Sequence, residues 1–249
     1  MFIPFLPHAW ASTPERLAVA TAVTVSFALL ARAVRGVTWS GAVAGGLACF
    51  ALFAGAGPGA FAALVTLFVM TWISTRLGYR RKQELGVAER KEGRRAWQVM
   101  ANLAVAGLGA LLFGATGSRG WLLAAMAALA EAATDTVASE IGQSGNQEAR
   151  LITTWKRVRA GVDGGITMYG TLTGLAAGII IAAVAGASGL LTRSEMSIAV
   201  AAGFAGMLGD SVLGATIQRR GWISNEGVNL MATLGAAALA YAVFVLNLV

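Results

Sequence analysis

The chain has 249 residues, of which 57% are hydrophobic and only 12% carry a charge. The charged share is about half that of a typical soluble domain, so the composition excludes a soluble globular domain, a disordered chain and a coiled coil. Long, unbroken apolar runs favour an all-α polytopic membrane protein over a β-barrel, whose strands alternate apolar and polar residues. The single cysteine, Cys49, excludes an intramolecular disulfide and a cysteine-based zinc site, and the single histidine, His8, leaves little for a Ser-His-Asp mechanism.

Eight apolar segments each approach the ~20 residues that a helix needs to cross a membrane. They cover 16–35, 37–56, 58–76, 96–116, 119–141, 164–188, 195–216 and 229–248. Small residues spaced by four in the sixth segment, Gly170, Gly174 and Gly178, predict close Gly/Ala packing between helices. We therefore expect a single integral-membrane domain, 1–249, with about eight transmembrane helices.

The Lys and Arg residues divide unequally between the two sides of this predicted bundle. Sixteen of the 19 fall on one side: Arg32, Arg35, Arg76, Arg80, Arg81, Lys82, Arg90, Lys91, Arg94, Arg95, Arg150, Lys156, Arg157, Arg159, Arg219 and Arg220. Because cytoplasmic loops are rich in Lys and Arg, we predict that the 76–95 and 142–163 loops are cytoplasmic and that both termini lie outside. The same rule accounts for the net charge of +7, so no nucleic-acid partner is expected.

Acidic side chains lie in or at the edge of the predicted spans, where a carboxylate is costly and indicates function. They are Glu131, Asp135, Glu140, Asp163 and Asp210. Asp135 is six residues, about 9 Å, from the cytoplasmic end of its helix, and Asp210 has a similar depth on a helix that runs the same way. Asn102 and Asn229 lie at a comparable depth, so these polar groups converge at the inner leaflet.

Two of the acidic stretches resemble each other, because Asp135-Thr136-Val137-Ala138-Ser139 aligns with Asp210-Ser211-Val212-Leu213-Gly214. This match indicates an internal duplication or two halves of one site. Two facing aspartates suit Mg²⁺, which takes few carboxylates and completes its shell with water and phosphate oxygens. The basic, hydroxyl and glycine residues of 150–165 add anion-binding groups beside a helix N-terminus. Phosphoryl transfer needs this combination of positioning and charge neutralisation.

Several ordered motifs resemble those of one membrane family. They are Ser74-Thr75-Arg76, Arg94-x-x-x-Gln98-Val99-x-x-Asn102, Asp135-Thr-x-Ala-Ser-Glu140-Ile-Gly142, Arg150-Leu-Ile-Thr-Thr-Trp-Lys156, Gly161-x-Asp-Gly-Gly165, Gly209-Asp-Ser-x-Leu-Gly-Ala-Thr-x-Gln218 and Val228-Asn229. Over about 36–245 the chain is similar to the integral-membrane family called domain of unknown function 92, which includes eukaryotic transmembrane protein 19 and the plastid phytyl-phosphate kinase. Arg76 departs from the family pattern, in which lysine is expected after Ser-Thr.

The resemblance implies a Mg²⁺-dependent lipid kinase that converts a phytyl or polyprenyl monophosphate into the diphosphate at the cytoplasmic leaflet. The segment that starts at Asp135 also resembles dolichol and phytol kinases, which use CTP, and more distantly the CDP-lipid synthases. Implied catalytic residues are Asp135, Asp210, Lys156 and Glu140, with the two aspartates as metal ligands. Implied substrate- and nucleotide-binding residues are Asn102, Arg94, Gln98, Ser139, Arg150, Thr154, Asp163, Gly164, Ser211 and Asn229. Expected partners are a nucleoside triphosphate, with CTP favoured, a prenyl-type lipid monophosphate and membrane lipids; a homodimer is allowed.

Two other functions stay open. A secondary transporter or channel would use the intramembrane carboxylates to carry protons or cations, and Glu131, about 15 Å deep, fits this function better than the kinase. A CTP-dependent cytidylyltransferase acting on a lipid phosphate would release pyrophosphate in place of a nucleoside diphosphate. The inner-leaflet position of the acids favours an enzyme over a transporter, because transporter sites lie near the midplane of the bilayer.

Overall fold

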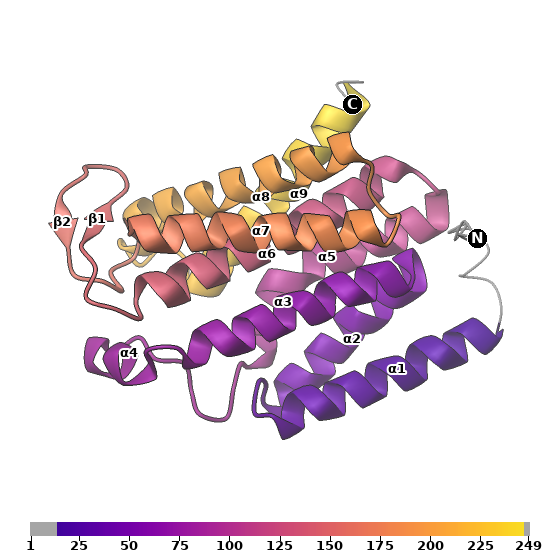
Figure 1. Cartoon of the computed structure of the whole chain (residues 1–249), viewed down its shortest axis with the longest axis horizontal. Helices are drawn as coiled ribbons and strands as arrows, with labels where there is room; N and C mark the ends of the chain where they lie inside the picture. The colour runs from indigo at the N-terminus through magenta and orange to yellow at the C-terminus, as the bar shows by residue number, and fades with distance from the viewer. Residues whose placement is uncertain (1–13, 247–249) are drawn as a thin grey trace.

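The computed structural model describes residues 14–246, so His8 and the last two residues of the eighth predicted span lie outside the described part. The described chain is mainly helical, with short strands between the sixth and seventh helices (Figure 1). The helices are α1 (Pro14–Ala33), α2 (Trp39–Ala56), α3 (Pro58–Arg76), α4 (Tyr79–Leu85), α5 (Ala96–Thr116), α6 (Arg119–Gly142), α7 (Met168–Ala187), α8 (Arg193–Leu213) and α9 (Asn225–Val245). The strands are β1 (Ala149–Leu151), β2 (Arg157–Val158) and β3 (Gly165–Ile166).

Seven of the described helices, α2, α3 and α5 to α9, are long and apolar enough to cross a membrane. The remaining expected span, 16–35, corresponds to α1, whose apolar part, Leu17–Ala33, is shorter and near the lower limit for a span. The structure therefore confirms an all-α polytopic membrane protein and makes the count of eight approximate.

The bundle is organised around α6, which packs against α3, α5, α7, α8 and α9. In its apolar part 83% of the residues are buried, a larger share than in any other candidate span of the described chain. Alanine is the commonest residue of this helix, and its small side chain allows five neighbours to approach. In contrast, α1 lies at the edge of the bundle against α2 (Figure 1).

The predicted glycine packing is confirmed where α7 meets α6. A Cβ atom added to Gly170 would lie 2.4 Å from the carbonyl oxygen of Ala138, and one added to Gly174 would lie 2.5 Å from the carbonyl oxygen of Thr134. One added to Gly178 would lie 2.5 Å from the hydroxyl of Thr134. Because two of these neighbours are backbone atoms, a larger residue would have to push the helices apart.

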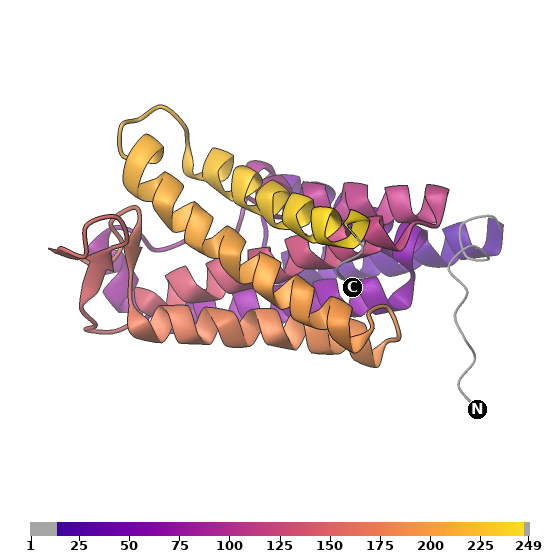
Figure 2. The ribbon, with the colours of Figure 1, turned by 90° about the horizontal axis from the view of Figure 1, so that it is seen from above.

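The connections in which the sequence gathers most of the basic residues lie at one end of the bundle, where α4 and the small sheet are found (Figures 1 and 2). The 142–163 segment, expected as a loop, contains β1, which pairs antiparallel with β2 on one side and β3 on the other. These strands have two or three residues each, too few for an alternating pattern to be recognised in the sequence.

Three helix boundaries differ from the predicted spans, two because of local caps and one because of a change in helix type. Thr167 caps α7 by accepting a hydrogen bond from the amide of Gly170, so this helix starts after β3. Ser224 caps α9 in the same way, which places Asn229 in the second turn of the helix and not at its opening. After α8 the chain continues into a π-helical turn, Gly214–Gln218, in which the amide of Arg219 bonds to the carbonyl of Gly214.

Candidate active site

A polar cavity of about 340 Å³ lies at the basic end of the bundle, enclosed by α5, α6, α8, α9 and the loop before α7. Eleven of the residues that the sequence indicates line it: Arg94, Gln98, Asn102, Asp135, Ser139, Glu140, Asp163, Gly164, Asp210, Ser211 and Asn229. They come from four helices and two loops that are far apart in the chain. The expected convergence of these polar groups is therefore present, and we call this space the polar cavity.

Three predicted residues do not line the polar cavity. Arg150 lies in β1 between the buried Ala149 and Leu151, and alternation along the strand directs it to the opposite face. Its guanidinium donates to the carbonyl of Trp155 at 3.1 Å. Thr154 and Lys156 are exposed in the turn that follows. The structure thus leaves the predicted catalytic lysine outside the cavity, because strand pairing carries the hairpin away from the helix ends.

Carboxylates dominate the wall of the polar cavity. Its acidic residues are Glu89, Asp135, Glu140, Asp163, Asp210 and Glu226, and Arg94 is the single basic residue among the described residues that line it. Such a wall repels a bare polyphosphate and attracts cations. A nucleotide would therefore enter this cavity together with a metal ion.

Asp135 and Asp210 project from α6 and α8, which run in the same direction, and their carboxylates lie close enough to repel each other. With its amide oriented to suit its neighbours, Asn229 donates to Oδ2 of Asp210 at 3.2 Å and accepts from Nδ2 of Asn102 at 3.3 Å. The Oδ1 atom of Asn102 is buried without a hydrogen-bond partner among residues 14–246. Such an atom indicates a place for a ligand or water, since buried acceptors are normally satisfied.

The donor set fits Mg²⁺ better than a metal held entirely by protein. Within residues 14–246 no group of three or more His, Cys, Asp or Glu side chains forms a ready metal cage. Magnesium does not need one, because it is held through one or two carboxylates and retains water and phosphate oxygens. Asp135 and Asp210 supply two such carboxylates.

The glycine-rich loop before α7 is shaped partly by packing. Gly161 and Gly164 have φ angles of 88° and 72°, which favour glycine. A Cβ atom on Gly164 would lie 2.4 Å from Cβ of Ala215 in the π-helical turn, so contact with this turn also requires glycine. Between these glycines, partial loss of solvent raises the pKa of the Asp163 carboxyl, and the charge of Arg219 opposes that rise.

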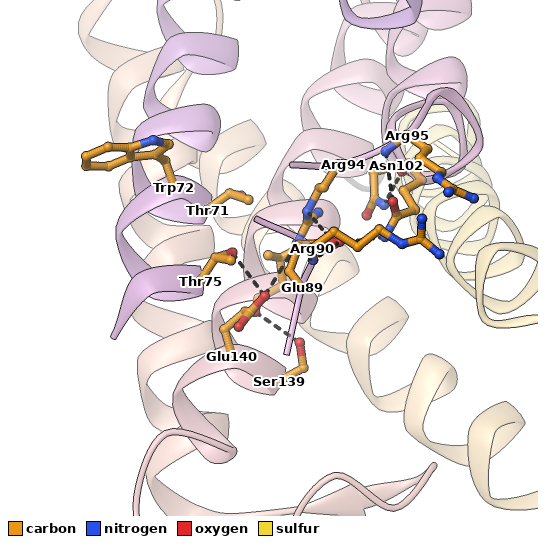
Figure 3. Close-up of polar contacts among 12 residues, drawn as sticks. Thr71, Trp72, Thr75, Glu89, Arg90, Arg94, Arg95, Asn102, Ser139 and Glu140 are labelled. Carbon is orange, nitrogen blue, oxygen red and sulfur yellow. Dashed lines mark hydrogen bonds and ion pairs between the residues drawn. The ribbon is translucent and has the colours of Figure 1, made fainter. Parts of the chain in front are cut away.

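Glu140 is held by a buried network that the sequence did not indicate, and Figure 3 shows its contact with Thr75. Its Oε1 accepts from the hydroxyl of Thr75 at 3.0 Å, and its Oε2 accepts from Nζ of Lys82 at 2.6 Å. Lys82 is fully buried and also donates to the carbonyls of Ser74 and Thr75. With both oxygens engaged, Glu140 is placed to fix α6 against α3 and α4. Nothing in the sequence separates Lys82 from the basic residues beside it.

A second cavity, also of about 340 Å³, lies among α1, α2, α3 and α5 and is mostly apolar. Its walls include Phe27, Ala28, Gly45, Leu64, Phe68 and Leu103. Basic residues stand at its end nearest the polar cavity: Arg35, Arg76, Arg90, Lys91 and Arg94. We call it the apolar cavity. The sequence did not reveal it, because an apolar residue that faces a cavity resembles one that faces lipid.

The two cavities share part of their walls, namely Glu89, Arg94, Gln98, Asn102 and Thr136. Arg94 stands at this junction, with its guanidinium 3.9 Å from Glu89 and 3.8 Å from Glu140 (Figure 3). Both distances exceed that of a normal hydrogen bond, so neither glutamate binds Arg94 tightly. The guanidinium is therefore placed to bind an anion between the two cavities.

Comparison with known proteins gives the family. The model of "Integral membrane protein DUF92" matches residues 22–237. The chain belongs to this family. It is 33% identical over 177 residues to the uncharacterized membrane protein MJ0933 of Methanocaldococcus jannaschii, a match that covers 69% of this chain and 70% of that protein.

Two further relatives of this DUF92 chain have similar identities. Uncharacterized membrane protein sll0875 of Synechocystis is 34% identical, over 67% of this chain and 66% of its own. Protein VTE6, chloroplastic, of Arabidopsis thaliana is 30% identical, over 70% of this chain and 55% of its own. The match thus spans just over half of the plant protein. No solved structure matches the chain.

Proposed function

We propose that this protein is a membrane-embedded lipid kinase. It transfers a phosphoryl group from a nucleoside triphosphate, CTP being favoured, to a phytyl- or polyprenyl-type monophosphate and yields the diphosphate. The observation that carries the proposal is the meeting of the two cavities at Arg94. An acidic polar cavity suits a metal-bound nucleotide, and an apolar cavity with a basic mouth suits a phosphate on an apolar tail. The family resemblance supports the same chemistry.

Each residue has a role that follows from its position. Arg94 holds the acceptor phosphate by paired hydrogen bonds from its planar guanidinium. Asp135 and Asp210 are the metal ligands, and Asn229 orients Asp210 through the hydrogen bond described above. When bound, Mg²⁺ would neutralise part of the negative charge on the polyphosphate. Holding both phosphates at one junction removes much of the entropic cost of bringing them together. By the positive-inside rule we expect this junction at the cytoplasmic leaflet.

The reaction products test the proposal directly. Purified protein is incubated with Mg²⁺, each of the four nucleoside triphosphates and a panel of prenyl monophosphates, and products are identified by mass. A lipid diphosphate with a nucleoside diphosphate is the expected result. A nucleotidyl lipid with pyrophosphate would identify a cytidylyltransferase instead. Absence of turnover with every pair would refute the enzymatic proposal.

Carboxylate-to-amide substitutions test the metal ligands. Asp135→Asn and Asp210→Asn keep the side-chain shape but remove the charge, and each should lower the rate by ~10²–10³. The double variant should lose little more than either single variant, because residues that act as one unit are not additive. Glu148→Gln, on an exposed residue outside both cavities, is the matched control. Near-full activity of Asp210→Asn with unchanged Mg²⁺ dependence would contradict the two-carboxylate site.

A transporter is the second candidate, and Glu131 favours it. This residue is only 1% exposed, and in the part of the chain that the structure describes neither of its carboxylate oxygens has a hydrogen-bond partner. It lies one helical turn deeper than Asp135, within electrostatic reach of Asp135 and Asp210. Glu131→Gln should be mild if the protein is a kinase and should abolish transport if Glu131 carries a proton or cation. Flux into proteoliposomes measured beside kinase activity separates the two functions.

A further inference from the structure

The apolar cavity reaches only part of the way across the bundle. On α3 the residues that line it run from Arg76 at the mouth to Leu64, twelve residues or about 18 Å along the helix. On α1 they run from Ala31 to Phe27, four residues or about 6 Å, and Arg35 lies just beyond the end of this helix. The hydrocarbon core of a bilayer is ~30 Å thick, so the cavity is roughly as deep as one leaflet.

Aromatic side chains close the deep end. Phe27 of α1 packs edge-on against Phe68 at 5.3 Å and against Phe61 at 5.5 Å, measured between ring centroids. Phe61 in turn packs against Phe53 of α2 at 5.8 Å. Phe27 and Phe68 line the cavity, whereas Phe61, one turn beyond Leu64, does not. The rings therefore form a floor that joins α1, α2 and α3.

The volume limits the number of tails. At about 340 Å³ the apolar cavity is at the lower end of the range of pockets that enclose one drug-sized ligand. Two acyl chains side by side would need more space than this. The charge at the mouth is complementary to a phosphate, because four basic residues besides Arg94 line the cavity near that end.

We infer that the apolar cavity binds the tail of a single-chain lipid monophosphate and that the ring cluster Phe27, Phe61 and Phe53 sets the longest tail that fits. The inference rests on the proposed function and deepens it by assigning the place where the tail of the acceptor binds and the residues that limit its length. It assigns the phosphate to Arg94 and the tail to the space between α1 and α3. Prenyl chains up to the depth of the floor are accommodated, whereas two-chain phosphatidic acid and long polyprenyl phosphates are not.

Gly45 offers a way to shorten the cavity without changing its polar end. A Cβ atom at Gly45 would contact Cγ1 of Val99 at 3.7 Å, an ordinary distance, so a side chain can be added there. Gly45 is the innermost of the α2 residues that line the cavity, so Gly45→Leu narrows the cavity from this side, and Gly45→Ala does so in part. Gly235→Leu is the matched control, because Gly235 is exposed in α9, lines neither cavity, and an added Cβ meets nothing within 4 Å.

The experiment compares geranyl, farnesyl, geranylgeranyl and solanesyl monophosphates with dioleoyl phosphatidic acid. Turnover and direct binding by native mass spectrometry are both recorded. Gly45→Leu should raise the KM for geranylgeranyl monophosphate about tenfold or more and leave geranyl monophosphate and the nucleotide nearly unchanged. Gly45→Ala should give a smaller shift in the same direction. Phe27→Leu, which lowers the floor, should favour longer tails.

Equal effects of Gly45→Leu and Gly235→Leu on every tail length would overturn the assignment, as would binding of phosphatidic acid as tight as that of the single-chain lipids. The two proposals fail separately. Chain-length-dependent binding that responds to Gly45 without any phosphorylation would refute the kinase and leave the tail site standing. Phosphorylation whose tail preference ignores Gly45 would refute the tail site and leave the kinase standing.

Discussion

Removal of the buried ammonium group of Lys82 perturbs the fold at a single well-defined point. The side chain is fully buried, and its three donors are all used, at 2.9 Å and 2.8 Å to the last carbonyls of α3 and at 2.6 Å to Glu140. A cation at these carbonyls also complements the negative end of the helix dipole. Lys82→Met preserves the length of the side chain but leaves the Glu140 carboxylate buried with weaker partners.

The expected loss of stability follows from the burial of the Lys82–Glu140 pair. Breaking a buried ion pair by removing one partner costs about 3–5 kcal/mol, because the remaining charge is uncompensated. For a chain of this size that loss corresponds to a fall in Tm of about 6–20 °C. The neighbouring pair Arg81–Glu84 is exposed, at 3.2 Å, and its loss should cost under about 1 kcal/mol. Arg81→Met is therefore the matched control.

Thermal unfolding in detergent of the two single variants measures the difference. Adding Glu140→Gln to Lys82→Met should recover part of the loss, because it removes the stranded charge. If the fall in Tm for Lys82→Met is no larger than that for Arg81→Met, the account in which Lys82 holds α3, α4 and α6 together is refuted. The account would also be refuted if the Lys82→Met/Glu140→Gln double variant lost more stability than the sum of the losses of Lys82→Met and Glu140→Gln measured singly.

Three further outcomes are expected. Cysteines placed at Glu92 and Asn146, in the two basic connections, should be protected from an impermeant thiol reagent in intact cells; labelling of both from outside would reverse the predicted orientation. Gly174→Leu should strongly reduce the yield of folded protein, because its Cβ would press on the backbone of α6, whereas Gly235→Leu should not; equal yields would contradict the close packing. Arg94→Lys keeps the charge but loses paired hydrogen bonding, so the KM for the lipid phosphate should rise about tenfold while the KM for the nucleotide changes little; the reverse pattern would reassign Arg94.

The parts of the fold that depend on local composition could be predicted from the sequence. Apolar length identifies the membrane helices, and spacing by four identifies the glycines of α7. Convergence of Asp135 and Asp210 was also predictable, because two residues at the same distance from the ends of helices that run the same way lie at one level in the bundle. The internal duplication stays a prediction, although both matching segments contribute an aspartate to the polar cavity.

The remaining features depend on contacts between distant segments. Lys82 is chemically the same as its basic neighbours, and only the approach of α6 makes it a buried partner of Glu140. Lys156 sits in a motif of the family, yet pairing of β1 with β2 carries it away from the polar cavity. The apolar cavity was invisible because residues such as Gly45 and Leu64 have the same polarity whether they face lipid, another helix or a ligand.

The π-helical turn Gly214–Gln218 makes the length of this segment matter as much as its composition. A π-helical turn holds one residue more than an α-helical turn, and such turns occur frequently at functional sites. Deleting one residue would convert it into a regular α-helical turn, and because both kinds of turn complete one rotation, Arg219 and the residues after it would keep their direction relative to Asp210. The widened backbone would be lost, and with it the close approach of Ala215 to Gly164. The length of this turn therefore sets the contact with the loop before α7 without changing the orientation of the residues that follow.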